Sequence, residues 1–424
     1  MTNEPITDAS NPAIVGLMPP GSRLEDGRLV LGGRLASELA DEFETPALVI
    51  DELALRARAR RYRDGLAARW PNSQVVWASK SLPCTAIYRI MGDEGLGVDV
   101  AGGGELVMAL AGGVDPARLV LHGNAKTDRE LAMALEAGVG TIVIDNLDDV
   151  ARLERLVSHE QGVLIRVIPD VVTATHDAIA TGHQNSKFGL AVPEARELVA
   201  RLAGSDRLRL DGLHVHIGSQ ILDVAPFARA VEAVAALGDF AVYDLGGGLG
   251  ARYTYDDHPP SIESYLDTIT DTARRYLPAS ARLLIEPGRS MIAESGVTLY
   301  RVVSVKRGAT RTFVAVDGGM GDNLEVSLYG QRFEATMADR VGGGTPYTVV
   351  GRHCESGDQL IESVALREPA VGDVLAVAAT GAYCLTMANN YNGALRPPIV
   401  LVGDGEARLA LRRETYEDLL RRDA

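Results

Sequence analysis

Short apolar runs rich in β-branched residues alternate with amphipathic segments over residues 75–288. The runs read VVWAS, GVDV, LVLHG, TIVIDN, VLIRVI, LHVHIG, VYDLGG and LLIEPG, which predicts eight strands. The segments between them, such as DRELAMALEAGVG, carry apolar residues at helical spacing and end in glycine, as helices commonly do. Eight consecutive β-α units predict a (β/α)8 barrel of the TIM type.

Beyond residue 295 strands recur without regular helices between them. These runs read TLYRVVSV, TFVAVDGG, YTVVG, VLAVAA, PIVLV and LALRR, which predicts a C-terminal β domain. GRLVLGG at residues 27–33 predicts one more strand for that domain. We therefore expect an N-terminal segment (1–44) that contributes to the β domain, a barrel (45–294) and the β domain itself (295–424).

Charge and composition exclude several classes of function. Acidic residues outnumber basic ones by 57 to 42 in 424 residues, and the one dense basic run, residues 56–63, suits a solvated helix face rather than nucleic acid. No stretch reaches the roughly 18 apolar residues of a membrane span, and no signal peptide is evident, so we expect a cytoplasmic protein. Cys84, Cys354 and Cys384 are too widely spaced for a disulfide framework or a zinc site, and we expect no metal.

Polar residues follow the predicted barrel strands at their C-terminal ends. Barrel enzymes place their active sites at this rim, so the pattern predicts an active site there. The residues are Lys80, Asp99, His122, Asp145, Arg166, His216, Gly246 to Gly248 and Glu286.

Lys80 closes the apolar run VVWASK. Desolvation at a strand end lowers the pKa of an ammonium group, which favours imine formation with an aldehyde cofactor. The alternative is a lysine that packs its stem and exposes its charge to water.

A phosphate site is predicted after the seventh and eighth strands. Consecutive glycines in DLGGGLG, Gly246 to Gly248, allow backbone N–H groups to approach an anion, although a glycine run is as often a tight turn. Arg289 in EPGRS offers a cation, and Ser219, just after the sixth strand, offers a hydroxyl.

Glu286 and the histidines of HVHIGSQ suit a flat heteroaromatic ring. A buried carboxylate can keep a pyridine nitrogen protonated, although Glu286 can equally cap nearby N–H groups. Strand alternation places His214 and His216 on one face, where one of them can stack on a ring; a satisfied pair of core histidines is the alternative.

Cys354 lies in the polar sequence HCESGD. A thiol in polar surroundings can deliver a proton to a carbanion, although an incidental loop cysteine fits as well.

The motifs WASK, GVDVAGGGEL, HGNAKT, TGHQNSKFG, GLHVHIGSQI, DLGGGLG, EPGRS, LYG, CESGD and TGAYC closely resemble, in their order, those of the diaminopimelate decarboxylases. That family has the alanine-racemase-like fold, which also includes ornithine and arginine decarboxylases. The resemblance covers residues 27–420 and implies pyridoxal 5'-phosphate as cofactor, with Lys80 as the Schiff-base lysine. It further implies His216 as the ring-stacking group, Glu286 as the partner of the pyridine nitrogen, and Cys354 as the proton donor.

Other contacts follow from the same resemblance. It implies that Ser219, Gly246 to Gly248 and Arg289 bind the phosphate, and that Tyr383 also contacts the cofactor. Four positions of the distal substrate pocket are kept: Arg289, Tyr329, Glu355 and Tyr383. A homodimer is implied as well, with the cysteine loop supplied by the neighbouring subunit. Independently of the resemblance, residues 174–189 are the best candidate for a lid, because the segment is long, polar and inserted before the sixth strand.

One position departs from the family pattern. Where the family carries an arginine that binds the substrate's distal carboxylate, DNLEVSLYG has Glu325. A carboxylate repels a carboxylate, so this change is not conservative.

Three interpretations of the substrate therefore stay open. The one we prefer from sequence is an amino acid without a free distal carboxylate, either basic or tethered to a carrier protein in a specialised pathway. The second is meso-diaminopimelate, decarboxylated to L-lysine. The third, a non-catalytic cofactor-binding regulator, is weakened by the presence of Lys80, Glu286 and Cys354. A racemase is disfavoured, because alanine racemases place an arginine where this chain has Glu286.

Overall fold

A computed structural model of the chain describes residues 13–169 and 186–424. These residues form two compact units. The barrel unit comprises Arg56–Gly250 and His258–Met291, and the β unit comprises the described residues up to Leu55 together with Ala251–Asp257 and Ile292–Ala424.

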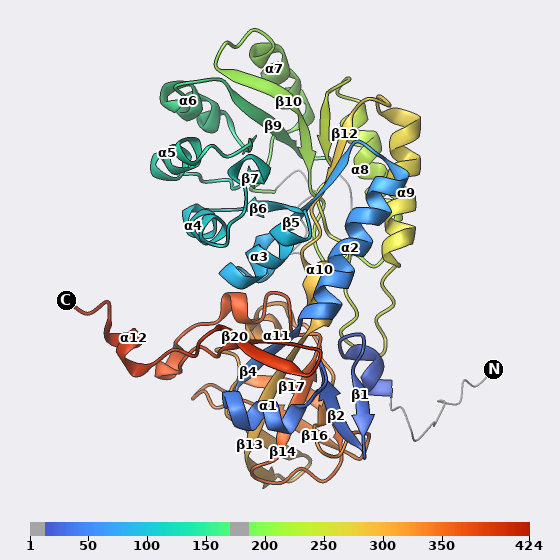
Figure 1. The fold of residues 1–424 in the computed structure, drawn as a ribbon, viewed down its shortest axis with the longest axis vertical. Helices are drawn as coiled ribbons and strands as arrows, with labels where there is room; N and C mark the ends of the chain where they lie inside the picture. Colours follow the sequence, from blue (N-terminus) through green and yellow to red (C-terminus); the bar gives the residue numbers. More distant parts are fainter. Residues whose placement is uncertain (1–12, 170–185) are drawn as a thin grey trace. The chain divides into compact units, whose positions relative to one another are not determined.

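Eight parallel strands close the barrel in their sequence order (Figure 1). They are β5 (Ser73–Ala78), β6 (Gly97–Val100), β7 (Leu119–Leu121), β8 (Thr141–Ile144), β9 (Gln161–Val167), β10 (Leu208–Val215), β11 (Val242–Asp244) and β12 (Arg282–Ile285). Inside, a layer of branched side chains is formed by Val76, Val120, Val143, Leu164 and Leu284. The predicted barrel is confirmed. It was predictable because strands that are covered on both faces appear in the sequence as continuous apolar runs.

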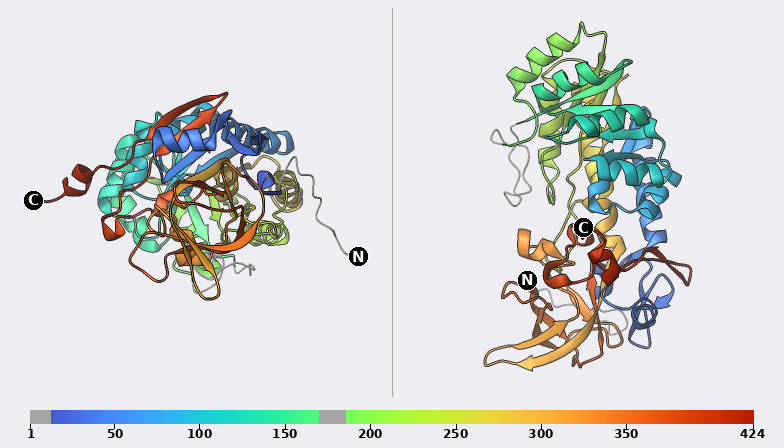
Figure 2. Two further views of the ribbon diagram at one scale, coloured as in Figure 1. Left: turned by 90° about the horizontal axis from the view of Figure 1, so that it is seen from below. Right: turned by 90° about the vertical axis from the view of Figure 1, so that its left-hand side faces the viewer.

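Helices lie around the barrel, as the two further views in Figure 2 show. They are α2 (Glu52–Arg69), α3 (Thr85–Asp93), α4 (Gly103–Ala111), α5 (Asp128–Ala137), α6 (Leu147–Leu156), α7 (Val192–Leu202), α8 (Ala225–Ala235), α9 (Ile262–Tyr276) and the short α10 (Arg289–Ile292). Helices α3 to α9 connect successive barrel strands, α2 precedes the first of these strands and α10 follows the last. Local sequence sets their limits. For example, a capping box of Thr127 and Glu130 begins α5, and left-handed Gly138 ends it.

A nine-stranded sheet dominates the β unit, in the order β17-β16-β14-β13-β4-β19-β20, with β18 and β15 paired to each other and β18 also to β13. Its strands are β4 (Ala47–Asp51), β13 (Gly296–Arg307), β14 (Thr312–Val316), β15 (Ala335–Met337), β16 (Thr345–Val350), β17 (Gln359–Leu366), β18 (Val374–Ala378), β19 (Ile399–Gly403) and β20 (Glu406–Leu411). The boundary expected at residue 45 requires correction, since β4 pairs with β13 and β19 rather than with barrel strands.

A separate three-stranded sheet precedes this one and consists of β1 (Arg23–Glu25), β2 (Arg28–Leu31) and β3 (Arg34–Leu35). The segment predicted at 27–33 contains β2, whose Leu29 and Leu31 share a buried core with Val49 and Val297 of the large sheet's strands. The helices of the β unit are α1 (Ala36–Phe43), α11 (Leu324–Tyr329) and α12 (Tyr416–Leu420).

Two further sequence predictions concern a lid and membrane-spanning segments. Most of the lid candidate at 174–189 lies outside the described residues. Among the helices of the described ranges, none combines the length and the apolar character that a membrane crossing needs.

Candidate active site

Lys80 follows β5 in a single 3-10 turn, Ser79–Ser81. The turn carries the chain past the strand end, and Lys80 is exposed while its neighbours Ser79 and Ser81 are buried. Burial therefore does not supply the desolvation that we predicted for this ammonium group. The lysine is nevertheless close enough to act electrostatically on His216 and Asp99 at the same rim.

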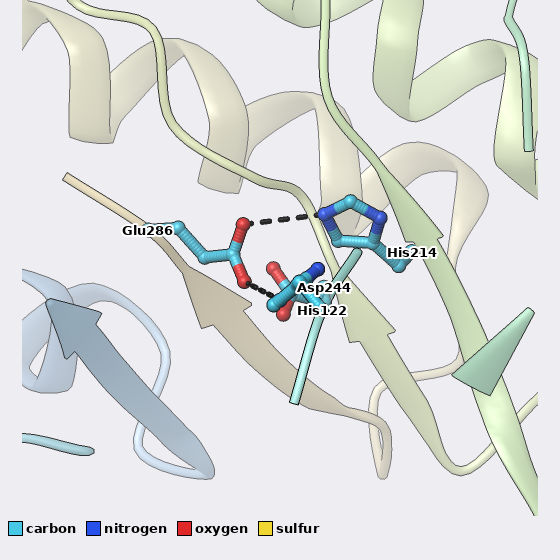
Figure 3. A group of neighbouring side chains, drawn as sticks. All are labelled: His122, His214, Asp244 and Glu286. Carbon is cyan, nitrogen blue, oxygen red and sulfur yellow. Dashed lines mark hydrogen bonds and ion pairs between the residues drawn. The ribbon is translucent and has the colours of Figure 1, made fainter. Parts of the chain in front are cut away.

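Glu286, directly after β12, is the centre of a buried polar cluster (Figure 3). Its Oε1 lies 2.6 Å from Nε2 of His122, at the end of β7, and its Oε2 lies 3.2 Å from Nε2 of His214 on β10. The two imidazole rings contact each other edge to face, with centroids 4.7 Å apart. Three strands thus converge on a single carboxylate.

The cluster keeps Glu286 ionised. Burial by itself raises a carboxyl pKa, but the adjacent imidazoles of His122 and His214 outweigh it and hold the pKa of Glu286 well below its ordinary value. Asp244 at the end of β11 behaves oppositely, because burial and the nearby charge of Glu286 raise its pKa well above the ordinary value. The pKa values of these two carboxyl groups thus shift in opposite directions, so the cluster favours negative charge on Glu286 and disfavours it on Asp244.

Asp99 and Arg166 complete the charged surroundings of this cluster. Oδ1 of Asp99 lies 3.9 Å from Nε2 of His122, and Nη1 of Arg166 lies 3.9 Å from Oδ1 of Asp145. Burial raises the pKa of Asp99. All four side chains, those of Asp99, His122, Asp145 and Arg166, lie at the C-terminal ends of strands, as the rim pattern predicted.

The glycine loop after β11 packs tightly against neighbouring backbone. A Cβ at Gly247 would lie 2.0 Å from the carbonyl oxygen of Glu286, and one at Gly246 would lie 2.3 Å from the carbonyl oxygen of Val215. Gly248 adopts a φ of 121°, which side-chain-bearing residues rarely do. The glycines are therefore required by this packing, whatever ligand the loop binds.

Two N–H groups of that loop already have partners in the protein. The N–H of Gly246 donates to Oδ1 of Asp244 at 3.0 Å, and the N–H of Gly247 donates to Nδ1 of His216 at 3.2 Å. Among the described residues, no hydrogen bond uses the N–H of Gly248. An anion at this loop would thus meet Gly248 as the available backbone donor of the three.

His216 itself is half-buried, and its ring accepts a hydrogen bond from Gly247 of the glycine loop. Burial, together with the cations Lys80 and Arg166, lowers the pKa of this imidazole well below its ordinary value, so the ring is neutral. A neutral ring whose Nδ1 accepts from Gly247 carries its proton on Nε2. A neutral, flat side chain is suited to stacking on an aromatic ligand.

Arg289 and Ser219 come together beside the glycine loop, although they are 70 positions apart. Nε of Arg289 donates to Oγ of Ser219 at 3.0 Å, and Arg289 is buried. A guanidinium, a hydroxyl and a glycine N–H form a donor set of the kind that binds phosphate.

A buried ion pair ties two rim loops together. Nζ of Lys126 donates to Oδ2 of Asp149 and to the carbonyl oxygen of Gly123, both at 2.6 Å. The same Asp149 oxygen accepts from the N–H of Asp145 at 3.0 Å. Burial lowers the pKa of Lys126, and Asp149 opposes that effect. The pair fixes the segments that follow His122 and β8.

The remaining predicted residues belong to the β unit. Cys354 is exposed, and its N–H donates to Oδ1 of Asn392 at 2.8 Å. The loop is further anchored by Asp358, which accepts from the N–H groups of Met320 at 2.6 Å and His353 at 2.7 Å. This places the predicted proton donor on an exposed but well-anchored loop.

The predicted substrate residues of the β unit differ in exposure. Glu325 and Tyr329 both lie on α11, with Glu325 buried and Tyr329 half-buried. Glu355 is exposed beside Cys354. Tyr383 is half-buried with a φ of 63°, an uncommon backbone conformation for a bulky residue. Glu325 is a buried carboxyl group, and such a group requires polar partners in the protein or in a ligand.

The barrel rim fits pyridoxal phosphate. Oε1 of Glu286 is buried and has no aligned hydrogen bond in the part of the chain that is described, although Nε2 of His122 lies 2.6 Å away, so this carboxylate oxygen can still accept an N–H. The donor set of Arg289, Ser219 and Gly248 suits the phosphate.

Sequence reasoning did not assign roles to His122, His214 or Asp244 in this cluster. The sequence identifies His122 only as a rim residue, and it offers His214 only as an alternative to His216 for stacking on a ring. Asp244 is absent from the predicted residues because the glycines that follow it mark the strand end there. An acidic residue directly after a buried strand, as in VYDLGG, is the signal that was available.

Comparisons with known proteins show the family to which this chain belongs. Residues 53–293 match the family model described as pyridoxal-dependent decarboxylase, pyridoxal binding domain. A diaminopimelate decarboxylase of Actinosynnema pretiosum subsp. auranticum is 47% identical over 100% of this chain and 97% of its own length. The diaminopimelate decarboxylase of Bacillus subtilis (strain 168) is 41% identical over 94% of this chain and 96% of its own.

Diaminopimelate decarboxylases are also found among the solved structures that resemble this chain. A diaminopimelate decarboxylase from M. jannaschii in co-complex with L-lysine superposes with a TM-score of 0.88 at 31% identity, covering 95% of this chain and 97% of that one. A lysine/ornithine decarboxylase from Vibrio vulnificus has a TM-score of 0.75 at 21% identity over 87% and 97% of the two chains, which shows the fold alone.

Proposed function

Because this chain belongs to the pyridoxal-dependent decarboxylases, and among them to the diaminopimelate decarboxylase-like proteins, we propose that it decarboxylates meso-diaminopimelate to L-lysine. The chain is a carboxy-lyase that uses pyridoxal 5'-phosphate and acts on an amino acid as a small-molecule substrate. The observation that carries the substrate is the 47% identity, over the whole chain, to a protein named diaminopimelate decarboxylase.

This proposal replaces the substrate that we preferred from sequence. Glu325 favoured an amino acid without a free distal carboxylate, basic or carrier-bound, but the named relatives favour the alternative. The two observations are compatible in chemical terms. The distal end of meso-diaminopimelate carries an ammonium as well as a carboxylate, and a buried glutamate is a natural partner for the ammonium.

Separate residues of this chain bind the cofactor's phosphate, its aldehyde carbon and its ring. Bound pyridoxal phosphate supplies an electron sink for the electron pair left when carbon dioxide departs. Lys80 anchors the cofactor, Arg289 and Ser219 hold its phosphate with Gly248, and His216 orients its ring. Glu286 accepts a hydrogen bond from the ring nitrogen.

Cys354 supplies the proton that replaces the departing carboxyl group. It is exposed on a loop whose backbone is held by Asn392 and Asp358. A thiol delivers a proton well near neutral pH. We include in the proposal that the protein is a homodimer in which this loop completes the partner's site. Tyr383, Tyr329 and Glu355 are assigned to the substrate and cofactor surroundings.

A direct assay tests the proposal. Carbon dioxide release is measured for the purified holoenzyme with meso-diaminopimelate, lysine, ornithine, arginine and carrier-bound glutamate. Turnover of meso-diaminopimelate with L-lysine as product supports the proposal, and turnover of another substrate alone overturns it. Borohydride reduction followed by peptide mapping tests the anchor separately, with a pyridoxyl group expected on Lys80.

A further inference from the structure

The two imidazoles that hold Glu286 are not equivalent. We propose that His122 and His214 are positioning residues with different tasks: His122 carries a proton and gives positive charge to one oxygen of Glu286, and His214 stays neutral and donates an N–H to the other. The inference rests on the proposed role of Glu286 as the partner of the cofactor's ring nitrogen.

Geometry first limits the cluster to one added proton. His122 and His214 are 6% and 1% exposed, and their ring centroids lie 4.7 Å apart. Two positive rings at that spacing, away from water, repel each other strongly. One imidazole is therefore charged at most.

The surroundings then select His122. Its Nε2 faces two carboxyl groups within 4.0 Å, Glu286 at 2.6 Å and Asp99 at 3.9 Å, whereas within the described ranges Nε2 of His214 has one such neighbour, Glu286 at 3.2 Å. In Figure 3, dashed lines join the carboxylate of Glu286 to both rings, and Asp244 belongs to the same cluster. The imidazole with two acidic neighbours holds a proton more tightly.

Other charged groups reach this cluster from β9 and β11. Arg166 disfavours a proton on either ring, and burial together with Glu286 raises the pKa of Asp244. The pKa directions agree with the geometry. Burial lowers the pKa of both histidines, but Glu286 and Asp99 raise that of His122 above its ordinary value, whereas the pKa of His214 falls to about 3.

The consequence concerns Glu286. A carboxyl group that is buried near Asp99 and Asp244 would take up a proton without a compensating cation. A protonated Glu286 would no longer be the anion that holds a ring nitrogen in its protonated form. His122 therefore acts through Glu286 and sustains the electron-withdrawing state of the ring, while His214 orients the carboxylate.

The decisive experiment compares His122→Gln with His214→Gln, since glutamine keeps a neutral donor at each position. The readout is the 15N chemical shift of ring-labelled pyridoxal phosphate in the holoenzyme, which reports protonation of the ring nitrogen. His122→Gln should lose ring protonation and lower kcat about 10- to 100-fold, as removal of residues that orient a primary ligand does. His214→Gln should retain ring protonation and lose less activity.

A second measurement needs no functional variant. Imidazole NMR signals of the wild-type apoenzyme, assigned with the two variants, should show His122 charged and His214 neutral at pH 7. Equal effects of the two variants on the ring nitrogen, or a charged His214 with a neutral His122, would overturn the inference. Absence of decarboxylation by the wild type would instead refute the proposed function, because proton placement is measured without substrate.

Discussion

The backbone N–H of Gly247 donates to Nδ1 of His216, and the Cα of this glycine faces the carbonyl oxygen of Glu286. Gly247 thereby positions both His216 and Glu286, the two residues assigned to the cofactor ring. The contact also fixes which nitrogen of the neutral His216 ring carries its proton.

Gly247→Ala should therefore disrupt cofactor binding. A Cβ would lie 2.0 Å from the oxygen of Glu286, so the loop must move away from His216 and from the strand end. We expect the affinity for pyridoxal phosphate to fall at least about tenfold, the equivalent of about 1.4 kcal/mol. Titration of the apoenzyme, followed by absorbance, measures this. The control is Gly104→Ala, where a Cβ meets nothing within 4 Å on helix α4. Equal affinity in both variants would contradict the prediction.

Sequence patterns predicted the barrel well because each parallel strand is short, apolar and locally encoded. They failed at β4, since a buried five-residue run looks the same in a barrel as in a mixed sheet. Its partners, Val297 and Val400, are far along the chain. The strand-end residues Lys80 and Glu286 were likewise predictable from position.

Proton placement was beyond sequence reasoning. Glu286 and Asp244 are both acidic residues at strand ends, and their opposite pKa shifts depend on which one the imidazoles contact. Similarly, the glycine run predicted an anion loop, but not that Asp244 and His216 use two of its N–H groups. Such features arise from side-chain geometry that spans several strands.

Breaking the Lys126–Asp149 pair should destabilise the barrel. Lys126→Met removes the buried cation of Asp149 but leaves Arg152, whose Nη2 lies 2.9 Å from Oδ1 of Asp149, so the loss should fall below the about 3–5 kcal/mol that a fully unpaired buried charge costs. Urea denaturation should show this loss in the free energy of unfolding. Lys306→Met, at an exposed position, is the control and should change it by less than about 0.5 kcal/mol. A loss below about 1 kcal/mol in Lys126→Met would mean that the pair adds little stability.

His214 should make the protein acid-sensitive. Its pKa is about 3 in the fold and near 6.5 when unfolded, so between these values the unfolded chain binds a proton that the native chain does not. Stability from this group is complete above pH 6.5 and is lost as pH falls, by about 1.4 kcal/mol per pH unit. The raised pKa of His122 has the opposite effect on stability, since the contribution of this group is present at low pH and is lost as pH rises.

Comparison with His214→Gln isolates this contribution. The difference in unfolding free energy between pH 7 and pH 5 should be smaller in the variant than in the wild type. Parallel pH profiles for the two proteins would show that His214 is not held neutral.

Glu325 should contribute to substrate affinity. It is buried on α11, and we assign it to the distal ammonium of meso-diaminopimelate. Glu325→Gln removes a charge-assisted hydrogen bond worth about 1.5–3 kcal/mol, so KM should rise about 10- to 100-fold with a smaller change in kcat. Steady-state kinetics with Glu362→Gln, an exposed position on β17, provide the control. An unchanged KM would remove Glu325 from the substrate pocket.

A shared active site can be tested by mixing two inactive variants. Lys80→Ala removes the cofactor anchor in the barrel unit, and Cys354→Ala removes the proton donor in the β unit. If the cysteine loop acts in the partner's site, a mixed dimer has one site with both defects and one site with neither. Random exchange of subunits, after mild denaturation and refolding of an equimolar mixture, should then restore about 25% of wild-type activity. If each chain completes its own site, every site in the mixture carries one defect, and activity stays at the level of the separate variants.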